Sequence, residues 1–312
     1  MKIVQWNIQS YNTNSEELKL LIHELGNPEV ICLQETVLGH RPMYTPANYS
    51  AIQSRRFNED DPERGVAIMI NKGCHHEALQ LQNLGRVEAV AARVRLGYEW
   101  YTICSMYLSP NIPFSGTDIS SVIAQLPEPF LLLGDMNAKH PTWGEDPPNN
   151  TGRIFDELLE DGDFMLLNSE TKTRLHIQNG TRTLIDLSIA SARIAPDFTC
   201  TVDDEQQRGS DHYPIVIENP AVRVDRERPM KFITERADWE EFRKNTQNYI
   251  APADESGINE KVESITNFLF QAALEAIPVS GGLPGKIPVP WFDDECRRVH
   301  RLRKRAARKL KT

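Results

Sequence analysis

The stretch FLLLGDMNAKH, residues 130–140, joins an apolar run to a dense set of polar side chains. The four apolar residues predict a buried strand, and Asp135, Asn137 and His140 follow within the next seven positions. Gly, Asp and Asn tolerate tight loops, so an ordinary turn is one interpretation. The other is that the strand end delivers a carboxylate, an amide and an imidazole to a catalytic site.

Similar apolar runs recur along the first two thirds of the chain, with turn residues between them. They predict further strands at 2–8, 29–34, 65–71, 87–96, 99–108, 183–190 and 212–217. Helical patterns lie at 10–26, near 117–126 and at 152–162. Many strands with few helices favour an α/β fold in which two mixed β-sheets pack face to face with helices outside, a four-layer α/β sandwich.

The first predicted helix lies in SYNTNSEELKLLIHELG, residues 10–26. Asn14 or Ser15 is expected to cap its amino end, because both residue types accept hydrogen bonds from the first free backbone N–H groups. Leucines and an isoleucine then recur at helical spacing, and Gly26 is expected to end the helix.

The character of the chain changes after residue 219, so we expect one domain over 1–219 and a helical linker region over 220–312. The linker ends in a basic helix, since residues 296–312 carry nine Lys or Arg and no acid. The first 295 residues hold 26 basic and 44 acidic side chains. The basic segment either favours nucleic acid by neutralising phosphates or is an exposed charged helix that is separated from its partner domain.

Composition excludes several classes of protein. No run of about 18 apolar residues predicts a membrane span, and no charged start with an apolar stretch predicts a signal peptide. We therefore expect a nuclear or cytoplasmic protein that neither crosses a membrane nor is secreted. The cysteines form no CxxC pair, which argues for reduced thiols and against structural zinc; they are Cys32, Cys74, Cys104, Cys200 and Cys296.

Polar side chains occupy the ends of several predicted strands. Each alone is compatible with a turn or a satisfied core group, but strand ends of one sandwich can converge on one cleft. The set is Asn7, Gln34, Glu35, Tyr107, Asp135, Asn137, Asp186, Ser210, Asp211 and His212.

Such a set suits metal-assisted phosphodiester hydrolysis. Carboxylates such as Glu35 are the ligands that Mg²⁺ prefers, and a bound cation would polarise the phosphoryl oxygen. His212 hydrogen-bonded to Asp186 would be held in one tautomer for contact with phosphate. Asp135 is placed to orient or deprotonate the attacking water, and Asn137 to hold that water or a phosphate oxygen. Serine hydrolase chemistry fits less well, because the chain has no GxSxG motif.

Six motifs in order, WNIQS, LQET, MYLSP, GDMNAKH, TLIDLSI and SDHYPI, resemble those of the endonuclease/exonuclease/phosphatase superfamily. The resemblance spans residues 1–219 and implies a DNase I-like sandwich that uses Mg²⁺, with Mn²⁺ as a substitute. It implies metal ligands at Glu35, Asn7 and Asp211. It implies catalytic roles for Asp135, His212, Asp186, Asn137 and Tyr107, and substrate contacts from Asn137, Tyr107, Ser210, His140 and Thr183.

Finer features, GDMNAKHPTWG, GRIFDELLEDGDFMLLN and TRTLIDLSIAS, resemble the endonuclease domain of jockey-like non-LTR retrotransposon proteins. WFDDECRRVHRLRKRAARKLKT resembles the stretch that joins this domain to the reverse transcriptase. The resemblance implies a chain that ends before the polymerase and nicks double-stranded DNA. The nick would leave a 3′-hydroxyl that primes reverse transcription, with the element's RNA or a reverse transcriptase domain as partners.

Two positions separate this chain from the abasic-site enzymes of the superfamily. Gln9 stands where those enzymes carry an acidic residue, which removes a metal ligand and makes a broad repair role less favoured. His140 belongs to the retrotransposon-like form of its motif. Phosphate contact and packing against Trp143 remain equal alternatives for His140.

Two other functions stay open at this level. The same sandwich cleaves phospholipids and other phosphate esters, because a fold does not fix the substrate. The chain is otherwise an inactive, domesticated fragment that binds nucleic acid or protein without turnover.

Overall fold

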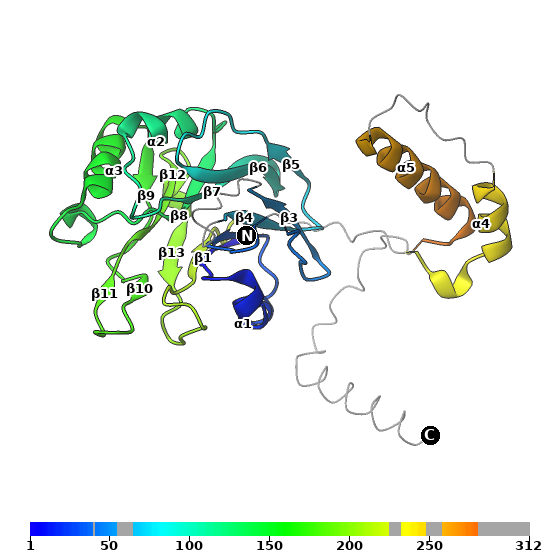
Figure 1. The fold of residues 1–312 in the computed structure, drawn as a ribbon, viewed down its shortest axis with the longest axis horizontal. Coiled ribbons are helices and arrows are strands. Elements are labelled where there is room, and N and C mark those ends of the chain that lie inside the picture. Colours follow the sequence, from blue (N-terminus) through cyan, green and yellow to red (C-terminus); the bar gives the residue numbers. More distant parts are fainter. Residues whose placement is uncertain (40, 55–64, 225–231, 248–257, 280–312) are drawn as a thin grey trace, which may run out of the picture. The chain divides into compact units, whose positions relative to one another are not determined.

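The computed structural model describes residues 1–39, 41–54, 65–224, 232–247 and 258–279. The chain forms two compact units, Met1–Glu227 and Arg228–Thr312, each of which is described by itself (Figure 1). The predicted basic helix at 296–312 and Cys296 lie outside the described residues.

Two six-stranded mixed sheets form the centre of the first unit. The order of the first sheet is β13-β14-β1-β2-β4-β3 and that of the second is β5-β6-β7-β8-β12-β9. The first comprises β1 (Lys2–Asn7), β2 (Val30–Gln34), β3 (Tyr49–Gln53), β4 (Ala67–Asn71), β13 (Thr199–Val202) and β14 (Ile215–Glu218). The second comprises β5 (His76–Leu79), β6 (Glu88–Leu96), β7 (Glu99–Tyr107), β8 (Phe130–Asp135), β9 (Phe164–Leu166) and β12 (Asp186–Ser191). A separate hairpin pairs β10 (Arg174–Leu175) with β11 (Arg182–Thr183).

Helices cover the outer faces of both sheets, which confirms the predicted four-layer sandwich. The helix α1 (Tyr11–Glu24) lies on one side, and α2 (Gly116–Ile123) and α3 (Asn150–Asp161) lie on the other (Figure 1). The run FLLL of β8 is continuously apolar because both of its faces are covered. Leu131 and Leu133 belong to the core between the sheets, whereas Leu132 belongs to the core under α2 and α3.

The strands that the sequence analysis missed are short or poorly buried. β3, β5, β9, β10, β11 and β13 have two to five residues, and most of their side chains are partly exposed. Four of them, β3, β5, β9 and β13, close the edges of the two main sheets. An edge strand needs no long apolar run, because solvent covers part of its surface, and periodicity is therefore a weak signal for it.

The predicted cap of the first helix is wrong. α1 begins at Tyr11, its N-cap is Ser10, and no side chain caps it. Asn14 lies inside the helix and is buried, and its Nδ2 atom donates to the Ile8 carbonyl at 2.7 Å. Asn14 therefore ties α1 to the end of β1, and this tertiary contact outweighs the ordinary preference of Asn for a cap.

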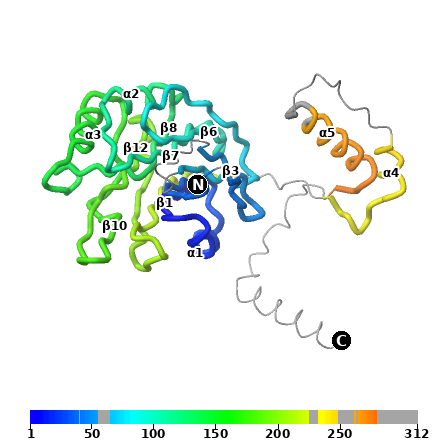
Figure 2. The backbone as a smooth tube through the Cα atoms, in the orientation of Figure 1, coloured from blue at the N-terminus to red at the C-terminus, as the bar shows by residue number. Residues whose placement is uncertain are grey.

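The described part of the second unit is a pair of helices, α4 (Trp239–Thr246) and α5 (Ile258–Ala276), visible at the yellow-to-orange end of the tube in Figure 2. Ala273, Ala276 and Ile277 form a small core with Phe232 and Phe242. The Asp238 side chain caps α4 by accepting from two backbone N–H groups. Of the helices in the described residues, none combines the length and the apolar character that crossing a membrane requires.

Candidate functional site

The strand directions bring the polar strand ends to one edge of the sandwich. β1 is parallel to β2, and β7 is parallel to β8, so their carboxyl ends lie together within each sheet. β12 is antiparallel to β8, and its first residue, Asp186, pairs with Asp135, which also pairs with Tyr107. A hydrogen bond of 3.0 Å from Asn7 Nδ2 to Asp135 Oδ2 links the two sheets at this edge. Residues from both sheets therefore share one site.

The backbone takes unusual conformations where the chain leaves these strands. Gln9, Glu35 and Asn137 follow β1, β2 and β8 with φ angles of 45°, 50° and 46°. Non-glycine residues seldom adopt this left-handed conformation, which is frequent at functional sites. Just before Asp135, a Cβ atom on Gly134 would lie 1.8 Å from the Met106 carbonyl oxygen. A side chain at residue 134 would therefore displace β8 at the site.

His212 and Asp186 form a fully buried pair. The His212 Nδ1 atom lies 2.9 and 3.0 Å from the two carboxylate oxygens of Asp186. The Thr173 hydroxyl donates to Asp186 Oδ2 at 2.5 Å, and Trp6 Nε1 donates to the His212 carbonyl at 3.0 Å. The imidazole is thus fixed in orientation, and its Nδ1 atom carries a proton whenever Asp186 is ionised.

Asp135 lies beside this pair and is equally buried. Its Oδ2 atom is 3.7 Å from His212 Nε2, and its Oδ1 atom accepts from the Asn137 backbone N–H at 3.0 Å. The Asn137 side chain donates to the Leu108 carbonyl, which follows β7. Asp135, Asp186 and His212 present ligand atoms that all lie within 4.8 Å of one another, so this acidic and histidine group is able to hold a metal ion.

The pKa values within this cluster reflect its burial. Burial and repulsion from Asp186 raise the pKa of Asp135 to about 7, against the opposing effect of His212. For His212, burial lowers the pKa, but attraction to Asp186 and Asp135 outweighs it and raises the value to about 9. The cluster therefore favours a charged imidazole between carboxylates.

Asp211 and Glu35 are the more exposed carboxylates around the cluster. The Asp211 Oδ2 atom accepts from Arg174 Nε at 2.9 Å. Its Oδ1 atom is buried, lies 3.6 Å from His212 Nε2, and has no hydrogen-bond partner among the described residues. A buried carboxylate oxygen without a partner is costly unless a ligand satisfies it. Glu35 is partly exposed and close enough to raise the pKa of Asp135.

The donor types around the cluster suit a divalent cation. Hard cations take carboxylate and amide oxygens, and the unsatisfied Asp211 oxygen, the Glu35 carboxylate and the Asn7 amide supply both kinds. The Asn7 Oδ1 atom also accepts from the Gln9 backbone N–H at 3.2 Å. The Gln9 side chain accepts from the Asp211 backbone N–H at 3.0 Å, so Gln9 fixes the Asp211 backbone.

The remaining predicted residues lie around the cluster with their own partners. The buried Ser210 hydroxyl donates to the Asn7 carbonyl at 2.7 Å and accepts from the His212 N–H. His140 Nδ1 lies 2.9 Å from the Thr142 hydroxyl, and its ring packs 5.4 Å from that of Trp143. Thr183 Oγ1, on β11, lies 3.4 Å from His176 Nε2. These partners give Ser210 and His140 positions in the local packing, and their substrate contacts stay predictions.

Sequence reasoning missed two residues of the site, Thr173 and Arg174. They follow one another in TKTRL, a stretch without an apolar run or a recognised motif. Only the fold shows that β10 pairs with the segment that carries His212. A threonine and an arginine outside predicted strand ends gave no signal in the sequence.

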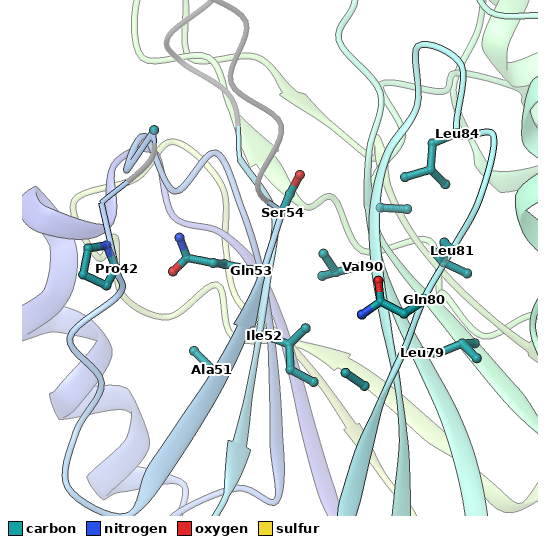
Figure 3. Close-up of a pocket in the computed structure, with 13 residues that line it drawn as sticks. Pro42, Ala51, Ile52, Gln53, Ser54, Leu79, Gln80, Leu81, Leu84 and Val90 are labelled. Carbon is teal, nitrogen blue, oxygen red and sulfur yellow. The ribbon is translucent and has the colours of Figure 1, made fainter. Parts of the chain in front are cut away.

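A pocket of about 940 Å³ lies between β3 and the strands β5 and β6 (Figure 3). Gln53 and Ser54 line one side of it, and Leu79, Gln80 and Leu81 line the other. In the part of the chain that the structure describes, its lining includes none of the residues assigned to the site.

The chain is similar in sequence to proteins encoded by mobile elements. The family model described as endonuclease-reverse transcriptase matches residues 101–216. The probable RNA-directed DNA polymerase from transposon BS of Drosophila melanogaster is 22% identical over 99% of this chain and 35% of its own length. The RNA-directed DNA polymerase from mobile element jockey of the same organism is 23% identical over 78% and 26%.

A solved structure resembles the first unit. The endonuclease domain of TRAS1, a telomere-specific non-LTR retrotransposon, superposes with a TM-score of 0.58 and 20% identity, covering 72% of this chain and 99% of that one. This chain is thus similar in sequence to transposon-encoded RNA-directed DNA polymerases and in fold to a non-LTR retrotransposon endonuclease domain. The first unit has the four-layer α/β sandwich that the six motifs predicted. The chain spans about a third of the length of the curated relatives it matches.

Proposed function

We propose that residues 1–219 are a divalent-metal-dependent endonuclease that hydrolyses one strand of double-stranded DNA and leaves a 3′-hydroxyl. Residues 220–312 would then be a linker toward a reverse transcriptase. The observation that carries the proposal is the buried Asp135, His212 and Asp186 cluster next to the unsatisfied oxygen of Asp211. The cluster combines carboxylates with an imidazole, and phosphodiester hydrolysis needs both a group that accepts a proton and a cation that stabilises the phosphate.

On the His212 side, side chains of the protein stabilise the developing negative charge and accept the proton of the attacking water. Asp186 holds Nδ1, so Nε2 is the atom that donates to a phosphate oxygen and stabilises the negative charge that develops on it. Asp135 accepts a proton from the attacking water, and Asn137 orients that water or the phosphate. We assign a second phosphate contact to Tyr107, whose backbone at the end of β7 pairs with that of Asp135.

On the open side, Glu35, Asn7 and Asp211 would hold Mg²⁺, with Mn²⁺ as a substitute. When bound, such a cation polarises the phosphoryl oxygen and lowers the cost of the departing oxyanion. Asp211 contributes the oxygen that lacks a protein partner, and Gln9 and Arg174 keep that carboxylate in place.

The test is conversion of supercoiled plasmid to nicked circle by purified protein, with Mg²⁺ or with EDTA. Nicking that requires Mg²⁺ and disappears in Asp135→Ala supports the proposal, and extension of the nick by a DNA polymerase identifies the 3′-hydroxyl. Glu77→Gln, an exposed carboxylate on β5 that pairs with Arg93, is the matched control and should nick as the wild type does.

Other results would favour other functions. Hydrolysis of a soluble phosphate diester without action on plasmid would favour a phosphoesterase. DNA binding without turnover in any divalent metal would contradict the proposal and indicate a binding fragment.

A further inference from the structure

Arg174 is a cation beside the cluster, and the proposed mechanism uses it only to hold the Asp211 carboxylate. It lies on β10, whose backbone is clamped to the catalytic segment. The Leu175 N–H donates to the Asp211 carbonyl at 2.7 Å, and the Tyr213 N–H donates to the Thr173 carbonyl at 2.7 Å. The position of the Arg174 backbone relative to His212 is therefore fixed from both sides.

Thr173 and Arg174, the neighbouring residues at the start of β10, each donate a hydrogen bond to a carboxylate near His212. The Thr173 hydroxyl donates to Asp186, and Arg174 Nε donates to Asp211 at 2.9 Å. A guanidinium has five N–H donors in a fixed fork, and Asp211 takes only the Nε atom. Among the described residues, no hydrogen bond occupies the terminal nitrogens of Arg174, and 27% of its side chain is exposed.

Arg174 is a positive charge beside several carboxylates in a protein with a net charge of −9. Burial lowers its pKa, but attraction to Asp211, Asp135 and Asp186 raises the value overall, so the guanidinium stays charged. Burial and repulsion from Arg174 and Lys139 lower the pKa of His176, which places these cations in one neighbourhood. Arg174 and Lys139 are therefore two cations on the side of the cluster where His176 lies.

We propose that Arg174 is a substrate-binding residue whose Nε atom holds Asp211 while its terminal nitrogens bind a phosphate oxygen of the DNA strand. The inference rests on the proposed nuclease function for its substrate. Arg is suited to this double task, because its fork is able to contact two acceptors at once, whereas Lys presents a single point charge. Arg174 would thereby couple the position of the phosphate to that of Asp211.

The experiment compares Arg174→Met, Arg174→Lys and Asp211→Asn with the wild type. For Arg174→Met we expect KM for plasmid to rise about tenfold, the effect of one lost charge-assisted contact. DNA affinity should also be measured in EDTA at several salt concentrations. The slope of log affinity against log salt concentration should become shallower by about 0.9, because one phosphate contact is lost. Arg174→Lys should keep the wild-type salt slope, and its KM should lie between those of the wild type and Arg174→Met.

Asp211→Asn separates the two tasks of the arginine. It leaves the guanidinium in place, so the salt slope should match the wild type even if Mg²⁺-dependent nicking falls. Arg93→Met is the matched control, since Arg93, on β6, also pairs with a carboxylate, Glu77, and lies over the ring of Trp100. It removes the same charge and should change neither KM nor the slope.

An unchanged slope and KM in Arg174→Met would overturn the inference and leave Arg174 a support for Asp211 alone. Wild-type protein that binds DNA in EDTA but never nicks would contradict the nuclease proposal, while the slope comparison would still decide the role of Arg174. Wild-type protein without measurable DNA affinity would overturn both.

Discussion

The two sides of the site differ in how completely the protein satisfies its own polar groups. On the His212 side, Asp186 binds the imidazole and a threonine hydroxyl, and every side chain of the cluster is at most 2% exposed. On the Asp211 side, a carboxylate oxygen has no partner among the described residues and Glu35 is partly exposed. One side is complete in the folded chain. The other leaves a buried carboxylate oxygen that a bound ligand would satisfy.

Asp186→Asn should give the largest effect, because it breaks the completed side without changing its shape. The amide of the Asp186→Asn variant lacks the negative charge that stabilises a protonated His212. Its NH₂ group is also able to donate to Nδ1, which would hold His212 in the tautomer with the proton on Nε2. We expect nicking to fall by about 10³-fold or more, with little change in DNA affinity. The measurement is single-turnover nicking at saturating Mg²⁺. Recovery of activity at higher Mg²⁺ would contradict this assignment, because the loss would then lie on the metal side.

Glu35→Gln should break the open side in a different way. Loss of one carboxylate ligand weakens cation binding, so the Mg²⁺ concentration for half-maximal nicking should rise about tenfold or more. The maximal rate should recover in part at high Mg²⁺, unlike that of Asp186→Asn. Thermal unfolding gives an independent readout, since a ligand that binds the folded state raises Tm.

Mg²⁺ should therefore raise the Tm of the wild type more than that of Glu35→Gln. An equal rise in both proteins would place the cation elsewhere, for example within the Asp135, Asp186 and His212 group. Glu77→Gln again serves as the control for loss of one negative charge, because its carboxylate lies on β5 and pairs with Arg93.

Thr173→Val should have an intermediate effect. The valine keeps the shape of the buried side chain but removes the donor to Asp186 Oδ2 and the acceptor for the N–H groups of Ile185 and Asp186. Loss of such an orienting hydrogen bond costs on the order of 10-fold to 100-fold in activity. Thr173→Ser retains the hydroxyl and should restore most of the rate. If the serine variant is as slow as the valine variant, packing rather than the hydrogen bond is responsible.

The sequence predicted the sandwich because its central strands are covered on both faces. β8 illustrates this, since its apolar run is continuous and a polar residue, Asp135, marks the point where it ends. The residues at such strand ends were identified by the same signal, and the structure brings Asn7, Asp135, Asp186, Asp211 and His212 together.

The sequence did not predict the supports of the site, for a physical reason. Thr173 and Arg174 act through β10, a two-residue strand whose pairing with residues 211–213 is set by the tertiary fold. Asn14 was assigned to a cap by its local preference, whereas its buried amide binds the end of β1. Contacts between segments far apart in the chain leave no periodic pattern.

Gln9 gives the smallest expected effect and the sharpest comparison of the two sides. The Gln9 side chain accepts from the Asp211 N–H on the open side. Among the described residues it makes no hydrogen bond to the side chain of His212 or of Asp186, which bind each other. Gln9→Ala removes the acceptor of the Asp211 N–H, a hydrogen bond worth about 1 kcal/mol, and of a longer contact of 3.5 Å from the Ser210 hydroxyl, so nicking should fall less than tenfold. Gln9→Glu keeps the acceptor and adds a carboxylate beside Asn7 and Asp211. The added charge should lower the half-maximal Mg²⁺ concentration a few-fold while kcat at saturation stays unchanged, and a rise in that concentration would place the cation away from residue 9.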